Sequence, residues 1–167
     1  KKIVQSSDDF QRGAEHTIMK VRLPSGEAVA VGTVICDEII FPDLVRQFVN
    51  EGATVMTTVT NDAWFGRTGA PYQHFSMAVL RAVENRVPVV RAANTGISGF
   101  IDAKGRILDS SGIFTEAVLT GSLTPGAAKT FYTRFGDVFS WLCVLGTFLA
   151  VIPLPRSTRQ PTKPLSQ

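Results

Sequence analysis

Short apolar runs alternate with amphipathic stretches along most of the chain. Runs rich in β-branched residues and bounded by glycine, proline or polar residues indicate strands, whereas apolar residues that recur every three or four positions indicate helices. Strands separated by helices predict an α/β layered domain. The expected strands are 17–23, 27–35, 53–60, 87–93, 97–102, 106–108 and 117–123, and the expected helices are 41–51 and 71–85. Pro24-Ser25-Gly26 and Ala103-Lys104-Gly105 should turn two hairpins.

A different pattern covers residues 138–155, which contain no charged residue. A helix of this length would reach roughly 27 Å at about 1.5 Å per residue, close to the ~30 Å hydrocarbon core of a bilayer. The stretch is apolar on all sides, with Trp141 near one end and prolines at the other. This pattern favours a transmembrane helix over a buried core helix or a dimer-forming tail, because a core helix usually has a polar stripe.

The charges around this stretch predict its orientation. Arg156, Arg159 and Lys163 follow it without an acidic residue, whereas Lys129 and Arg134 before it are accompanied by Asp137. The positive-inside rule therefore places the C-terminal tail in the cytoplasm and the preceding domain in the periplasm.

Composition excludes several other classes of protein. The 167 residues carry a formal charge of only +3, and the basic residues are scattered, so no nucleic-acid surface is expected. Cys36 and Cys143 lie in contexts that should not meet, which argues against a disulfide, and the two histidines have no ligand-like spacing to either cysteine, which argues against a metal site. The chain begins without methionine or a signal-peptide pattern, as expected for a piece of a longer protein.

Cys36 is the main candidate for chemistry. It follows the apolar run 28–35 and precedes a helix-like stretch, so a strand end would hold the thiol while the next turn offers backbone N–H groups to an oxyanion. The alternative is an inert buried thiol. Asp37 and Glu38 disfavour a thiolate, so any group that activates Cys36 must come from elsewhere.

A second motif lies in residues 60–66. Asn61 and Asp62 at a strand end are ordinary turn residues, but Trp64 and Phe65 put two aromatic rings in a glycine-flanked loop. Such loops often line pockets. The alternative is that the rings cap the core.

These two motifs, together with Gln73-His74, resemble the C-terminal part of the apolipoprotein N-acyltransferases, the membrane-bound branch of the nitrilase superfamily, over residues 32–152. The resemblance implies a partial α-β-β-α sandwich, of which this chain supplies about half. It divides the chain into the C-terminal part of a nitrilase-like catalytic domain (1–135), a transmembrane helix (136–155) and a basic cytoplasmic tail (156–167). The implied location is the bacterial inner membrane, with the catalytic domain facing the periplasm.

The resemblance also implies a reaction. The thiolate of Cys36 would take an acyl chain from a phospholipid as a thioester and pass it to the amino group of the N-terminal diacylglyceryl-cysteine of an apolipoprotein. The family completes a Glu-Lys-Cys triad with residues from upstream segments that have no counterpart here, so this chain alone should be inactive. No cofactor and no metal are implied.

The resemblance assigns roles to individual residues. Cys36 would be the nucleophile, and Glu38 would shape the site or assist proton movement, unless it is simply a carboxylate at a helix N-terminus. The expected substrate-binding residues are Asp37, Asn61, Trp64 and Phe65, although the family more often has an aromatic residue at the position of Asp37. The family does not use His74 as a base, so a structural hydrogen bond is expected there.

Two other functions stay open at this point. A soluble nitrilase-type amidase would share Cys36 and the sandwich but would not need the uncharged stretch 138–155. The second is an inactive truncated remnant that lacks two members of the triad.

Overall fold

The computed structural model describes residues 13–152, which form two compact units that divide after Gly136. The first unit contains a six-stranded sheet and most of the helices, and the second contains a single described helix. The strands are β1 (Ile18–Arg22), β2 (Ala28–Ile35), β3 (Val55–Asn61), β4 (Val89–Asn94), β5 (Gly99–Ile101) and β6 (Ile107–Ser110). The helices are α1 (Pro42–Asn50), α2 (Ala70–Asn85), α3 (Phe131–Phe135) and α4 (Val138–Val151), with 3₁₀ turns η1 (Cys36–Ile40) and η2 (Asp62–Phe65).

The sheet is mixed, and its strands follow the chain order from β1 to β6. The three central strands β2, β3 and β4 are parallel, whereas β1, β5 and β6 join antiparallel at the two edges. Ile35 pairs with Val59, and Asn61 pairs with Asn94. The carboxyl ends of the central strands therefore meet at one edge, where Cys36 follows β2 and η2 follows β3.

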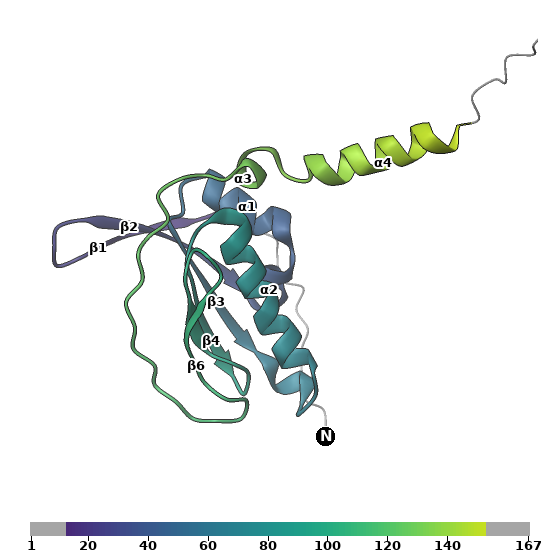
Figure 1. The fold of residues 1–167 in the computed structure, drawn as a ribbon. Helices are drawn as coiled ribbons and strands as arrows, with labels where there is room; N and C mark the ends of the chain where they lie inside the picture. Colours follow the sequence, from purple (N-terminus) through teal and green to yellow (C-terminus); the bar gives the residue numbers. More distant parts are fainter. Residues whose placement is uncertain (1–12, 153–167) are drawn as a thin grey trace, which may run out of the picture. The chain divides into compact units, whose positions relative to one another are not determined.

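Helices α1 and α2 cover one face of this sheet (Figure 1). Pro42 opens α1, where its fixed φ suits the first turn, and Arg86 ends α2 in the left-handed conformation (φ 55°). The apolar faces of α1 and α2 pack against the side chains of every second strand residue. This packing stabilises the helices and strands that the sequence predicts. The resulting core contains Val34, Val45, Phe48, Val49, Met56, Phe75, Ala78, Ala82, Val89 and Ile101.

The opposite face of the sheet carries exposed apolar side chains. Ile35 is 62% exposed and its neighbour Val59 is 45% exposed. Alternate residues of a strand point to opposite faces, so these side chains point away from α1 and α2. Within residues 13–136 the chain therefore supplies one sheet with α1 and α2 on one face.

The prediction of a strand at 117–123 is wrong. The segment has no regular secondary structure and belongs to no sheet. Gly121 lies against the Phe100 side chain of β5, where an added Cβ would lie 3.2 Å from Cδ2. A strand needs a neighbouring ladder of N–H and C=O groups, which this position does not offer. The other expected strands and both expected helices form, with ends displaced by a few residues.

Helix α4 makes up the described part of the second unit. It spans 14 residues, its side chains are exposed, and Ile152 after it has an extended backbone. The helix expected over 136–155 is therefore shorter within the described residues, and residues 153–155 lie outside them. None of the helices between residues 13 and 152 has the length and apolar character needed to cross a membrane, so the transmembrane prediction is not confirmed.

Candidate active site

Cys36 occupies the sharp turn between β2 and η1. The strand ends at Ile35, and Cys36 takes a left-handed backbone conformation with φ 52°. Non-glycine residues seldom adopt this conformation, which costs about 1–3 kcal/mol and persists only where the surroundings enforce it. The half-buried thiol is thus presented at the carboxyl end of a central parallel strand, as expected from the sequence.

Two hydrogen bonds hold this turn. The carboxylate of Glu38 accepts a hydrogen bond from the backbone N–H of Ile35 at 2.7 Å. The backbone carbonyl of Cys36 lies 3.3 Å from Nε2 of His74 on α2. Glu38 therefore fixes the start of η1 from within, while His74 fixes the Cys36 peptide from the neighbouring helix.

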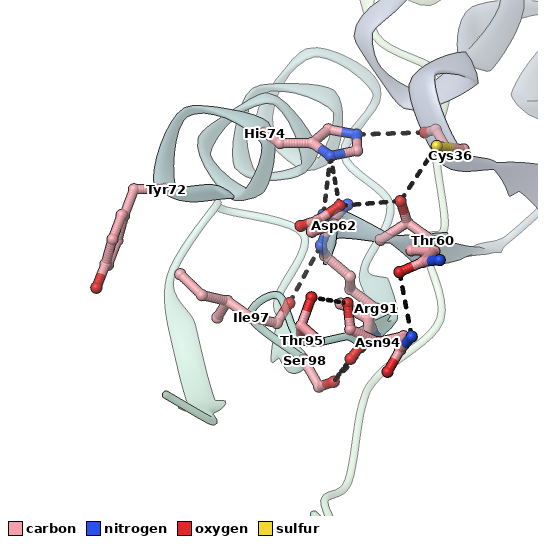
Figure 2. A network of polar contacts seen from close by, with 12 residues as sticks. Cys36, Thr60, Asp62, Tyr72, His74, Arg91, Asn94, Thr95, Ile97 and Ser98 are labelled. Carbon is pink, nitrogen blue, oxygen red and sulfur yellow. Dashed lines mark hydrogen bonds and ion pairs between the residues drawn. The ribbon is translucent and has the colours of Figure 1, made fainter. Parts of the chain in front are cut away.

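The thiol has one polar side-chain neighbour in Figure 2, the hydroxyl of Thr60. Oγ1 of Thr60 lies 3.4 Å from Sγ of Cys36 and 3.0 Å from Oδ1 of Asp62. The hydroxyl therefore links the thiol to a buried carboxylate.

Asp62, His74 and Arg91 form a buried polar cluster behind the thiol (Figure 2). Their exposed fractions are 1%, 5% and 2%. Oδ2 of Asp62 accepts from Nη2 of Arg91 at 2.8 Å, and Oδ1 lies 3.0 Å from Nδ1 of His74. Nε of Arg91 also donates to the carbonyl of Ile97 at 3.1 Å. A buried charge needs a partner of opposite charge, and Asp62 and Arg91 supply this partner to each other.

The electrostatics of Arg91 connect the cluster to the thiol. Burial lowers the pKa of Arg91 below its ordinary value, while the carboxylate of Asp62 raises that pKa. The negative charge of an ionised Cys36 also raises the pKa of Arg91. A guanidinium remains charged in proteins, so a cation lies within electrostatic reach of Cys36.

The residues expected to bind substrate lie in different surroundings. Asp37 is exposed, and the ring of Trp64 is 65% exposed. Asn61 is held at the strand end, where its Oδ1 accepts from Nδ2 of Asn94 at 3.1 Å. The Phe65 ring meets the His74 ring edge-on, with centroids 6.0 Å apart. Phe65 thus contacts the buried cluster through His74, while Asp37, Asn61 and Trp64 are exposed.

The structural hydrogen bond expected for His74 is confirmed, but Thr60, Asp62 and Arg91 were missed as parts of the site. Alternation along β3 carries a signal for Thr60, which shares the parity of buried Met56. Asp62 follows the strand end, and alternation gives no signal for it. Arg91 is a charged residue inside an otherwise apolar central strand, which itself calls for a buried partner.

The glycine-containing segment that follows β4 requires glycine at position 96. An added Cβ at Gly96 would overlap the carboxylate of Asp62. The loop can therefore close over the buried cluster only because this position has no side chain.

No group of three or more His, Cys, Asp or Glu side chains that could hold a metal ion occurs between residues 13 and 152.

The mixed sheet, the helices on one face and the thiol after a central parallel strand define an α/β domain of the nitrilase type. The family model described as carbon-nitrogen hydrolase matches residues 5–132, and the chain belongs to this family. Its described fold resembles yeast Nit3, a member of branch 10 of the nitrilase superfamily, with a TM-score of 0.51 and 21% identity, over 92% of this chain and 51% of that one. An amidase from Nesterenkonia sp. AN1 gives a TM-score of 0.50 at 20% identity, over 82% of this chain and 51% of that one.

The sequence is also similar to curated apolipoprotein N-acyltransferases. The protein from Geobacter metallireducens is 50% identical over 145 residues, which cover 87% of this chain and 27% of that protein. The protein from Chlorobaculum tepidum is 38% identical over 135 residues, which cover 81% of this chain and 25% of that protein. The matched region is thus about a quarter of the length of each of these relatives.

Proposed function

We propose that this chain is the C-terminal part of an apolipoprotein N-acyltransferase and supplies its nucleophile, Cys36. The observation that carries the proposal is the 50% identity to the Geobacter N-acyltransferase across 87% of the chain. The site adds independent support, because Cys36 is the first residue of η1, and the first N–H groups of a helix have no acceptor within it. Residues 1–135 would belong to the catalytic domain, and the exposed apolar face with Ile35 and Val59 would pack against the other half of the sandwich.

In the proposed reaction, the thiolate of Cys36 attacks an ester carbonyl of a phospholipid. The C–O bond breaks, the leaving alcohol takes a proton from a general acid, and the acyl group remains on sulfur as a thioester. The free amino group of the diacylglyceryl-cysteine of an apolipoprotein then attacks the thioester. An amide forms, the amine loses a proton to a base, and the C–S bond breaks to restore the thiolate.

The turn after Cys36 suits this chemistry. The first N–H groups of a helix have no acceptor within it, so the backbone N–H of Asp37 can donate to the developing oxyanion. Glu38 shapes the turn and could assist proton movement. Phe65 would line the reaction side of the site, while exposed Asp37, Asn61 and Trp64 would meet the substrates or the membrane surface.

The proposal is tested by acyl transfer from a labelled phospholipid to a diacylglyceryl peptide. A longer protein that contains this chain should form labelled amide, and without acceptor it should carry hydroxylamine-labile label on Cys36. The 167-residue chain alone should give background rates, because the family's Glu and Lys are absent; base catalysis is typically worth ~10²- to 10⁴-fold. Hydrolysis of simple amides without any phospholipid-dependent transfer by the longer protein would favour an amidase and overturn the proposal.

We further propose that residues 136–155 anchor the chain in the bacterial inner membrane, with the catalytic domain in the periplasm and residues 156–167 in the cytoplasm. The support is the uncharged sequence of 138–155 and the exposed apolar side chains of α4, among them Phe139, Leu142 and Phe148. A transmembrane anchor would also bring Cys36 to two substrates that reside in the bilayer.

The anchored protein should stay in the membrane pellet after alkaline carbonate extraction. A reporter enzyme that works only in the cytoplasm should be active when it is fused after residue 167. A reporter that works only in the periplasm should be inactive at the same position. The matched control replaces Leu145 and Leu149 with arginine, which should release the protein, because each arginine at the centre of a membrane helix costs about 2.5–3.5 kcal/mol in insertion. Complete extraction of the unaltered protein would contradict the anchor.

A further inference from the structure

The hydroxyl of Thr60 has two polar neighbours but only one hydrogen to donate. Oγ1 lies 3.4 Å from Sγ of Cys36 and 3.0 Å from Oδ1 of Asp62. A carboxylate only accepts hydrogen bonds, and a thiolate also only accepts, whereas a thiol can donate weakly. The direction of these two contacts therefore depends on the charge of Cys36.

With a neutral Cys36, both contacts can be hydrogen bonds. The S–H donates to Oγ1 of Thr60, and the Thr60 O–H donates to Oδ1 of Asp62. When Cys36 is a thiolate, the sulfur needs a donor, and rotation of the Thr60 hydroxyl supplies one without moving any heavy atom.

The cluster behind Thr60 permits this rotation. When the hydroxyl turns away, Oδ2 of Asp62 still accepts a hydrogen bond from Nη2 of Arg91 at 2.8 Å. The buried carboxylate therefore keeps its cationic partner in both arrangements, and an unpaired buried charge is avoided. His74 also lies 3.3 Å from the Cys36 carbonyl, so the same cluster fixes the peptide that carries the sulfur.

We propose that Thr60 is a positioning residue for Cys36: its hydroxyl stabilises the thiolate by turning from Asp62 to the sulfur, while Asp62, His74 and Arg91 hold both in place. The proposal rests on the assignment of Cys36 as the nucleophile. Thr60 neither gains nor loses a proton. The thiol proton passes to a base, the sulfur loses its charge as the S–C bond of the thioester forms, and the hydroxyl returns to Asp62.

The thiolate lies among several charged or titratable groups. Asp37 and Glu38 belong to its own turn, Asp62 to η2, His74 to α2 and Arg91 to β4. The three carboxylates oppose a further negative charge, whereas Arg91 favours it. A hydroxyl that donates directly to sulfur favours the thiolate without adding another charge to this group of side chains.

The test is the pH dependence of Cys36 alkylation by iodoacetamide in the 167-residue chain. All variants carry Cys143→Ser, so that only Cys36 reacts. Thr60→Val removes the hydroxyl at nearly constant volume and should raise the midpoint pH of the rate profile by about one unit, a roughly tenfold slower reaction below the midpoint. Thr60→Ser retains the hydroxyl and should restore the profile to within about twofold.

Thr58→Val is the matched control. Thr58 lies on the same strand and the same face, is fully buried, and its hydroxyl has no hydrogen-bond partner among the described residues. This variant should leave the alkylation profile unchanged. Circular dichroism checks that each variant is folded, and Thr60→Ala replaces Thr60→Val if the valine is not accommodated.

Three results would overturn the proposal: an unchanged midpoint in the folded variant that lacks the hydroxyl, a serine variant as slow as the valine variant, or an equal shift in Thr58→Val. These outcomes leave the proposed acyl transfer intact. That function fails instead if the longer protein shows no phospholipid-dependent acyl transfer.

Discussion

Replacing Cys36 by serine in the longer protein is expected to reduce phospholipid-dependent N-acylation to background, a loss of about 10⁴-fold or more. Serine keeps the size of the side chain, and it meets the same backbone requirement at φ 52°. The loss therefore reflects chemistry, because a serine alkoxide is far harder to generate than a thiolate. The measurement is the initial rate of labelled amide formation at equal amounts of folded protein.

The matched control is Cys143→Ser. Cys143 lies in α4 and is exposed, and it should be replaceable with no change in rate. If Cys36→Ser retained turnover near that of the unaltered protein, another residue would have to be the nucleophile.

Arg91→Met should produce the largest loss of stability, about 3–5 kcal/mol, because it leaves the buried carboxylate of Asp62 without its cation. Methionine is apolar and flexible enough to occupy much of the space left by the arginine. Arg91 is 2% exposed and Asp62 is 1% exposed, so water cannot take over the lost contact at 2.8 Å. The check is urea denaturation of the 167-residue chain, followed by circular dichroism.

Arg106→Met provides the comparison. Arg106 pairs with Asp102 on the surface, with 70% of its side chain exposed, so its loss should hardly shift the denaturation midpoint. Adding Asp62→Asn to Arg91→Met should recover part of the stability, since the double variant no longer buries an unpaired charge. Equal midpoints for Arg91→Met and Arg106→Met would contradict the stabilising role assigned to the buried pair.

Local patterns were sufficient to predict the framework of the domain. The β-branched run before Cys36 and the turn at Pro24-Ser25-Gly26 are encoded by neighbouring residues, and both form as expected; Leu23 donates its backbone N–H to Glu27 at 2.8 Å across that turn. The segment 117–123 has an equally strand-like composition but no partner ladder. Whether an apolar segment becomes a strand depends on what lies beside it, and a local pattern does not contain that information.

The candidate site was predictable only in part for the same reason. Cys36 stands out because its strand and its turn are both visible in sequence. The cluster behind it joins Asp62, His74 and Arg91 from three separate elements, and their meeting depends on the parallel register of β3 and β4. The position of Arg91 in a central strand calls for a buried partner, but Asp62 has an ordinary turn interpretation when considered alone, and only their common burial shows that they belong together.

The left-handed backbone at Cys36 restricts which nucleophiles this position can accept. A β-branched residue is a genuine outlier at positive φ, because its second branch crowds the backbone. Cysteine and serine both have an unbranched Cβ, whereas threonine does not. The divergence of such a domain toward new chemistry can therefore exchange sulfur for oxygen at this turn, but backbone strain disfavours the secondary alcohol of threonine there.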